Sequence, residues 1–322
     1  MKFSYVERNG VHLLRLDNEK GLIVFLSKIG ASIYGIKYDD KWMTLTPKSL
    51  KDYFSDHSYY GKTIGPVSNR VKDGIIKIND KEYQLNQNEG TTSLHSGRNS
   101  LSFAVFDIIN ISENKDNITI VFKFIPHKNN RNLPGKVVYQ ISYTLTDKDE
   151  LYVTLNAMSD EDTVVALTNH AYFCLGDEDI SHLSMQISSK KYIESDKDTL
   201  IPLKEKDIIS CLDFNQEKLL TKDINDPYLM EHKTKGYDHH FIFDKENKVL
   251  LENERYKLVI TTDMTGAQIY TDNYADEIEM FSSQKPLRRG VAIEPQDSTL
   301  NREVLKKGDI YSRFISYQFY KK

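Results

Sequence analysis

Short alternations of apolar and polar residues recur along nearly the whole chain and restrict the folds that it can adopt. Such alternation is typical of strands that bury one face, because successive side chains on a strand point to opposite sides. Turn residues separate the segments, at 79–80, 113–117, 147–150 and 244–247, and the last three of these loops have the length of hairpins. The predicted strands are residues 11–16, 21–26, 74–80, 81–85, 103–111, 117–125, 137–145, 151–158, 182–188, 239–244, 248–252, 255–262, 266–271, 290–294 and 314–320.

Helical periodicity is not sustained along the sequence, and residues 45–54 predict at most a turn or two of helix. More than a dozen short strands separated by hairpin-like turns are typical of a sandwich or a barrel. The sequence shows no linker rich in proline, glycine or serine, and no repeat period. We therefore predict a single all-β domain over residues 1–322, with few or no helices.

Charge, hydropathy and cysteine content limit the classes of partner and the compartment that are expected for this domain. A net charge of −4 with interspersed signs offers no basic field for a phosphate backbone, so a nucleic-acid partner is not expected. The amino terminus carries charges throughout, unlike a signal peptide, and no stretch approaches the roughly 18 apolar residues of a membrane helix. Cys174 and Cys211 lack the spacing of a metal site or a disulfide framework, which fits a reducing cytoplasm.

The aromatic load is high, with 20 tyrosines and 14 phenylalanines. These rings pack well on pleated sheets, and that explanation requires no function. They also form the apolar surfaces on which sugar rings stack.

Polar residues interrupt the strand pattern first between residues 65 and 97. Asn69 and Arg70 follow a glycine–proline turn, and His95 closes a polar loop. Binding groups are common on loops held by a rigid scaffold, and the planar arginine fork suits hydroxyl or carboxylate oxygens. The alternative is an ordinary surface arginine and a capped loop histidine.

A second interruption lies at residues 167–173, where Asn169 and His170 end an apolar run. Burying such a pair without a purpose is costly, and histidine is the side chain best suited to exchange a proton near neutral pH. A core histidine with satisfied hydrogen bonds is the simpler alternative. Cys174, which follows, is interpreted as a small core hydrophobe.

A third interruption is Glu294, which stands at the end of an apolar strand and is followed by Pro295. We expect the proline to end strand pairing there. A carboxylate at such a point, directed into a cleft, is a natural general base whose pKa burial would adjust. The alternative is a surface glutamate in a turn.

The fourth signal is the sequence Gly-Tyr-Asp-His-His at residues 236–240. Adjacent residues on a strand face opposite sides, so His239 and His240 are not expected to share an ion, and no further histidine has the spacing of a third ligand. We therefore predict no metal site, and interpret Asp238 as an acceptor for sugar hydroxyls.

In their order along the chain, these segments resemble the aldose 1-epimerases, also called galactose mutarotases. The motifs are Asn-Arg at 69–70, Leu-His-Ser-Gly at 94–97, Asn-His-Ala-Tyr-Phe at 169–173, Gly-Tyr-Asp-His at 236–239, Gln-Ile-Tyr-Thr at 268–271 and Glu-Pro-Gln at 294–296. The resemblance implies the large galactose mutarotase-like β-supersandwich. It also implies an isomerase of carbohydrate metabolism that interconverts the α and β anomers of a free aldohexose such as galactose or glucose.

The resemblance further implies roles for individual residues. Glu294 would be the general base that accepts the proton of the anomeric hydroxyl, and His170 the general acid that protonates the ring oxygen. His95 would hold the same oxygen region, and whether His95 or His170 delivers the proton is left open. The residues implied to bind the sugar are Asn69, Arg70, His95, Tyr172, Asp238 and Gln268. No cofactor is implied, and a monomer or a homodimer is expected.

This sequence also departs from the family pattern. Ser96 stands where many members have glycine, Cys174 where asparagine is common, and residues 297–301 differ from the usual stretch after Glu-Pro-Gln. The identity of the sugar is therefore open. One alternative is a relative acting on a phosphorylated or uncommon sugar, with Lys62, Arg70 and Arg98 as a cationic cluster. Another is a sugar-binding protein without turnover on the same fold.

Overall fold

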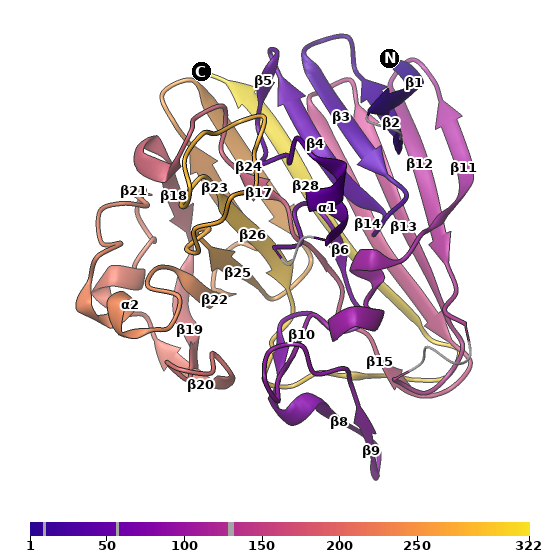
Figure 1. Cartoon of the computed structure of the whole chain (residues 1–322), viewed down its shortest axis with the longest axis vertical. Coiled ribbons are helices and arrows are strands. Elements are labelled where there is room, and N and C mark those ends of the chain that lie inside the picture. The colour runs from indigo at the N-terminus through magenta and orange to yellow at the C-terminus, as the bar shows by residue number, and fades with distance from the viewer. Residues whose placement is uncertain (9–10, 56–57, 128–131) are drawn as a thin grey trace.

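The computed structural model describes residues 1–8, 11–55, 58–127 and 132–322. Within these residues the named strands pair antiparallel, forming sheets of nine, six and five strands and four two-stranded ribbons (Figure 1). The prediction of an all-β architecture is confirmed. Each predicted strand segment overlaps an observed strand.

The five-stranded sheet is a meander in chain order. Its strands are β1 Lys2–Arg8, β2 Val11–Asp17, β3 Leu22–Ser27, β4 Ser32–Tyr38 and β5 Lys41–Trp42. The nine-stranded sheet runs, from edge to edge, β11 Asp107–Glu113, β12 Asn117–Phe124, β13 Val137–Thr146, β14 Glu150–Ser159, β28 Ile310–Lys321, β24 Tyr256–Thr262, β23 Lys248–Glu252, β18 Ser184–Ile187 and β21 Lys218–Leu219.

The six-stranded sheet carries much of the candidate site. In order across the sheet, it consists of β17 Tyr172–Phe173, β26 Val291–Gln296, β25 Gly266–Tyr270, β22 Asp238–Phe243, β19 Ser189–Ser195 and β20 Pro202–Asp207. The two-stranded ribbons are β6 Thr63–Ile64 with β16 Thr168–Asn169, β7 Arg70–Val71 with β10 Ser93–Leu94, β8 Ile75–Ile78 with β9 Lys81–Gln84, and β15 Thr163–Val164 with β27 Val304–Leu305.

Helices are few, as predicted. In the described part of the chain the α-helices are α1 Leu50–Ser55 and α2 Pro227–Glu231, and α1 overlaps the segment predicted to form a helical turn. Short 3₁₀ turns lie at Lys72–Gly74, Gly97–Asn99, Leu101–Phe103, Ile180–His182 and Ser210–Leu212. Within the same residues, none of the helices has the length and apolar character needed to cross a bilayer.

Alternating burial explains how the sheets stack. Along β13, Tyr139, Ile141 and Tyr143 are buried while their neighbours are less so, and β14 alternates in the same way. A single apolar cluster joins buried side chains of all three large sheets, for example Leu16 of β2, Ile141 of β13 and Ile269 of β25. The six- and five-stranded sheets thus both contribute to the core of the nine-stranded sheet.

The loop at 244–247 is short, but it does not make a hairpin. β22 belongs to the six-stranded sheet and β23 to the nine-stranded sheet, so the loop carries the chain from one sheet to the other. β18 and β19 cross between the same two sheets, and the backbone N–H of Asp244 donates to the carbonyl of Ser188, 3.0 Å away, where the crossings meet. Loop length alone carries no information about which sheet the next strand joins.

Substitutions at neighbouring positions of β13 test this layering. Ile141→Ala removes a fully buried side chain and should lower the free energy of unfolding by about 2–5 kcal/mol. Gln140→Ala, one residue away on the exposed face, should change it by less than about 0.5 kcal/mol. Urea denaturation measures both free energies of unfolding. Similar losses of stability in the two variants would contradict the assignment of Ile141 to the buried face of β13 and Gln140 to its exposed face.

Candidate active site

One face of the six-stranded sheet gathers polar side chains that lie far apart in the sequence. Tyr172, Tyr270 and Asp238 stand in one row across β17, β26, β25 and β22, according to the strand register. Glu294 and Gln268 face each other two residues further along their strands. Since side chains separated by two residues share a face, all five lie on the same side of the sheet.

A second wall comes from the ribbon of β7 and β10. Asn69 and His95 both adopt left-handed backbone conformations, with φ of 61° and 53°, and they hold each other. The backbone N–H of His95 donates to the carbonyl of Asn69, and the backbone N–H of Asn69 donates to Nδ1 of His95, both at 3.1 Å. This exchange fixes the orientation of the His95 ring.

The third wall is the segment that follows β16. The backbone of His170 pairs in both directions with the 61–62 segment, its N–H donating to the Lys62 carbonyl and its carbonyl accepting from Gly61. Asn169 is fully buried and satisfied, since its amide donates to the Gly61 carbonyl and its oxygen accepts from the N–H of Ala171. Asn169 therefore shapes the backbone that presents His170.

These walls enclose a cavity of about 860 Å³ that opens to solvent. The eight residues predicted for the site all line it: Asn69, Arg70, His95, His170, Tyr172, Asp238, Gln268 and Glu294. Aromatic rings also contribute to the lining: Tyr59, Phe103, Tyr172, Tyr270 and Tyr274.

An imidazole and a carboxylate meet inside this cavity. Nε2 of His170 lies 3.3 Å from Oε1 of Glu294, and their side chains are only 6% and 3% exposed. Their strands, β16–β17 and β26, are about 120 residues apart in the sequence, and the β17–β26 pairing brings them together. The two side chains are therefore brought into contact by long-range strand pairing, and both are almost completely buried.

Burial shifts both acid–base groups toward their neutral forms. It lowers the pKa of His170 to about 3, with the charge of Lys62 acting in the same direction. It raises the pKa of Glu294 well above its ordinary value, aided by Asp238 and opposed by Arg70. Burial therefore favours the pair in which both groups are neutral, a protonated carboxyl group 3.3 Å from an imidazole nitrogen.

His95 completes a group of three whose ligand-type atoms all lie within 4.8 Å of one another, an arrangement that resembles a metal site. A backbone N–H occupies Nδ1 of His95, so the neutral ring carries its proton on Nε2 and has no free lone pair for a metal. Burial, His170 and Arg70 lower the pKa of His95 well below its ordinary value, which keeps the ring neutral. The group suits hydrogen bonding and proton exchange better than metal coordination.

On one side of the cavity, four polar residues are joined in a closed ring of hydrogen bonds. Asn69 Nδ2 donates to Gln268 Oε1 at 3.0 Å, and Gln268 Nε2 donates to Asp238 Oδ1 at 2.6 Å. Asp238 Oδ2 faces Arg70 Nη1 at 3.5 Å, and the backbone N–H of Arg70 donates back to Asn69 Oδ1 at 2.7 Å. Each polar group is thus oriented by its neighbour before any ligand arrives.

Sequence reasoning missed several lining residues. Glu89 lies within the polar segment 65–97 and Tyr270 within the motif 268–271, so a signal was present for both. Tyr59, Phe103 and Tyr274 lie outside the motifs, and nothing in a single sequence separates them from other aromatic residues.

Two expectations about individual residues were wrong. Pro295 does not end strand pairing: β26 continues to Gln296, and Pro295 pairs with Ala267 of β25. β17 pairs only with Val291 and Ala292 of β26, so the other side of Pro295 has no ladder partner that needs its missing N–H. Lys62 is not an exposed loop cation that lines the cavity, because it is fully buried, with Nζ 4.6 Å from the ring centre of Phe103.

The departures at Ser96 and Cys174 have structural explanations. Ser96 has φ of 66°, a conformation that favours glycine, and its hydroxyl accepts from the Val67 N–H and donates to the Val67 carbonyl. Cys174 is buried in an apolar cluster with Tyr172, and its Sγ contacts the Trp42 carbonyl at 3.3 Å. Both residues support the walls without entering the cavity lining.

Comparisons with known proteins were made on sequence and on structure. The model of the family described as aldose 1-epimerase matches residues 12–318. An aldose 1-epimerase of Haemophilus influenzae is 29% identical over 81% of this chain and 79% of its own length. A galactose mutarotase of Sus scrofa is 30% identical over 84% of this chain and 81% of its own length.

Solved structures show the same fold. A galactose 1-epimerase from Lactobacillus acidophilus superposes with a TM-score of 0.86 at 24% identity, covering 99% of this chain and 98% of that one. An aldose epimerase homologue from C. elegans gives a TM-score of 0.82 at 21% identity, with 99% of each chain covered. The predicted galactose mutarotase-like β-supersandwich is therefore confirmed.

The Ser96 hydroxyl provides a test of how the loop beneath His95 is held. Ser96→Ala removes two hydrogen bonds while keeping a Cβ at a left-handed position, and should lower the free energy of unfolding by about 1–3 kcal/mol. Ser96→Gly loses the same bonds but suits the backbone better, so its loss should be smaller. Chemical denaturation of both variants gives the comparison, and a Ser96→Ala protein as stable as the wild type would contradict it.

Proposed function

The chain belongs to the aldose 1-epimerase family, a family of isomerases that act on carbohydrates, and we propose that its cavity interconverts the α and β anomers of a free aldohexose such as galactose or glucose. The observation that carries this proposal is the buried contact of 3.3 Å between His170 and Glu294 in a cavity lined by hydroxyl-binding groups. Opening a pyranose ring requires one proton to leave the anomeric hydroxyl and another to reach the ring oxygen.

In the proposed mechanism the pair first places its proton on His170, which leaves Glu294 as a carboxylate. Glu294 accepts the proton of the hydroxyl on C1, and His170 gives its proton to the ring oxygen as the bond from C1 to that oxygen breaks. The resulting aldehyde rotates about C1–C2. Ring closure on the other face reverses both transfers, so the pair ends with the single proton with which it began.

The remaining cavity residues position the sugar in this proposal. His95, oriented by Asn69, donates from Nε2 toward the ring oxygen region. Because it is a neutral donor with its other nitrogen occupied, His95 stabilises that oxygen while His170 exchanges the proton. Asn69, Arg70, Asp238 and Gln268 are proposed to bind hydroxyl groups, and Tyr172 to contact the apolar face of the ring.

Several coarser expectations remain proposals alongside this one. We propose one domain over residues 1–322, acting as a monomer or homodimer without a cofactor. Cys174 and Cys211 are both free and buried, which is consistent with a reducing cytoplasm.

A sugar-binding protein without turnover is the alternative from another functional class. It would need the hydroxyl-binding ring, but it would have no use for an acid and a base held in contact and shielded from water. Calorimetric binding of galactose without any acceleration of its anomerisation would favour this alternative.

Substitution of the base is the direct test of the enzyme. Glu294→Gln keeps the shape of the side chain but cannot accept a proton, so the anomerisation rate should fall at least about 10²-fold. Polarimetry of α-galactose and α-glucose approaching equilibrium measures the rate. Glu252→Gln on β23, which removes a carboxylate paired with Lys322 outside the cavity lining, serves as the control. A wild type that accelerates no common aldose above buffer would overturn the proposed function.

The pH profile tests the state of the pair. The mechanism needs one proton on the pair of His170 and Glu294, so the enzyme should be inactive when the pair carries no proton or two protons. The pH dependence of kcat/KM reports these protonation states in the free enzyme. Because burial lowers the pKa of His170 to about 3, a second proton binds only in strong acid. Activity should therefore persist as the pH falls from 7 to 5. A decline with a midpoint near 6.5, where an exposed histidine titrates, would show that His170 is not shielded as described.

A further inference from the structure

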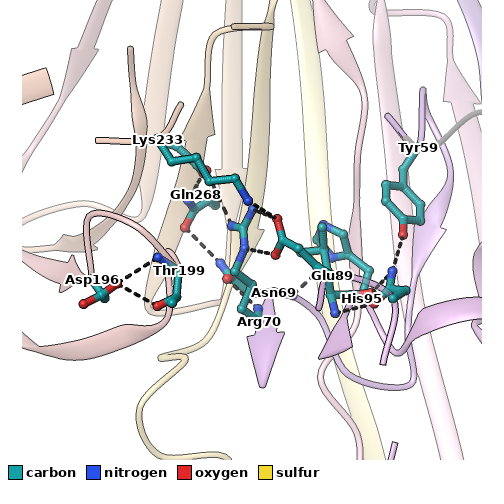
Figure 2. Close-up of polar contacts among 12 residues, drawn as sticks. Tyr59, Asn69, Arg70, Glu89, His95, Asp196, Thr199, Lys233 and Gln268 are labelled. Atoms are coloured by element: carbon teal, nitrogen blue, oxygen red, sulfur yellow. Dashed lines mark hydrogen bonds and ion pairs between the residues drawn. The ribbon is translucent and has the colours of Figure 1, made fainter. Parts of the chain in front are cut away.

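Glu89 lies where the cavity meets solvent and contacts two cations. Its carboxylate accepts from both sides of the Arg70 fork, with Oε2 at 2.6 Å from Nε and Oε1 at 3.2 Å from Nη2. Nζ of Lys233 lies 3.7 Å from Oε1, and Figure 2 shows the ends of Lys233 and Arg70 both reaching the Glu89 carboxylate. The Glu89 side chain is 25% exposed and the Arg70 side chain only 10% exposed.

A tight turn fixes the position of Glu89. Its backbone N–H donates to the Thr92 carbonyl at 3.1 Å, and the N–H of Thr92 donates back at 3.0 Å. Gly90 follows in a left-handed conformation, with φ of 61°, which the turn requires. The turn therefore fixes the backbone of Glu89, and the contacts with Arg70 and Lys233 orient its carboxylate.

The charges that face the cavity favour a neutral ligand. The carboxyl groups of Glu89, Asp238 and Glu294 line it together with the guanidinium groups of Arg70 and the exposed Arg98. Arg70 is shared between Glu89 and Asp238, so its charge is already matched. The edge of its guanidinium formed by Nε and Nη2, which could bind a phosphate or carboxylate, is occupied by Glu89.

Of the three carboxyl groups, Glu89 is the one whose pKa is lowered. Burial acts to raise its pKa, but the hydrogen bonds and charges of Arg70 and Lys233 outweigh burial and lower the pKa below its ordinary value. For Asp238 and Glu294, in contrast, burial raises the pKa. The negative charge at the solvent side of the cavity is thus permanent near neutral pH.

We propose that Glu89 is a specificity-determining residue that excludes anionic sugars, such as hexose phosphates and hexuronates, by occupying the Arg70 fork and screening Lys233. This inference rests on the proposed function, since it concerns which sugars reach the same acid–base pair. An anionic sugar would have to displace Glu89 or approach its charge, whereas a neutral hexose encounters neither cost. Removing the carboxylate would leave Arg70 and Lys233 as a pair of cations suited to an anion.

Glu89→Gln tests this inference because it removes the charge and keeps the side-chain size. The measured quantity is the ratio of kcat/KM for glucose 6-phosphate or glucuronate to kcat/KM for glucose. We expect the substitution to raise this ratio about tenfold at low ionic strength, and less at high salt because the added cations are screened. A residue that only orders Arg70 would affect neutral and anionic sugars alike and would leave the ratio unchanged.

Two variants complete the design. Glu89→Asp retains the charge and should retain most of the wild-type preference. Glu205→Gln, which removes an ion-paired carboxylate from β20 outside the cavity lining, should leave the ratio unchanged. If Glu89→Gln turns over too slowly, calorimetry with glucose 6-phosphate replaces the kinetics, and tighter binding than in the wild type is expected.

The outcomes separate this inference from the proposed function. Failure of the wild type to accelerate glucose anomerisation overturns the function itself. The role of Glu89 is overturned, and the proposed function is not, if the wild type turns over glucose normally while Glu89→Gln leaves the ratio of kcat/KM for anionic sugar to glucose, or the affinity for glucose 6-phosphate, unchanged. A wild type that prefers glucose 6-phosphate to glucose overturns it as well.

Discussion

The organisation of this site depends on one contact, in which a carboxyl group and an imidazole lie 3.3 Å apart and almost fully buried. Neither group would remain ionised alone at such a depth, and burial moves the pKa of each toward its neutral form. In the proposed mechanism the two act as a unit, in which a proton passes from one to the other while the total charge stays constant. This property suits a reaction that removes one proton from a substrate and returns another.

Holding such a pair requires rigid surroundings, which the packed sheets supply. Glu294 lies on β26, a strand whose residues are all buried, and the ring of hydrogen bonds from Asn69 to Asp238 fixes the adjacent wall. Behind Tyr172 lies Tyr60, with ring centres 4.9 Å apart, and Tyr60 accepts a hydrogen bond from the buried Arg289. Two carboxylates, Asp272 and Asp276, neutralise Arg289 (2.7 and 2.8 Å) and make this support a network rather than one contact. The nine-stranded sheet underlies these elements (Figure 1).

Sequence reasoning predicted most strands that bury one face, and also the short apolar run that forms the wholly buried β26. The strand β20, at Pro202–Asp207, is almost entirely exposed and β4, at Ser32–Tyr38, is almost entirely buried, so neither shows alternation, and neither was predicted. The loop at 244–247 was misinterpreted because sheet membership depends on distant partners. Polar residues within apolar strands were the informative signal for the site, and the eight predicted residues line one cavity. The ion pair of Glu89 with Arg70 and the burial of Lys62 were beyond prediction because both result from contacts set by the folded chain.

The proposed mechanism requires Glu294 and His170 to face one sugar across the cavity and to act on its anomeric end. The decisive measurement is a crystal structure of the protein with bound galactose. We expect a Glu294 oxygen within hydrogen-bonding distance of the hydroxyl on C1, and Nε2 of His170 within the same distance of the ring oxygen. A galactose bound with its anomeric carbon toward Glu89 and solvent, or bound outside the cavity, would contradict the mechanism.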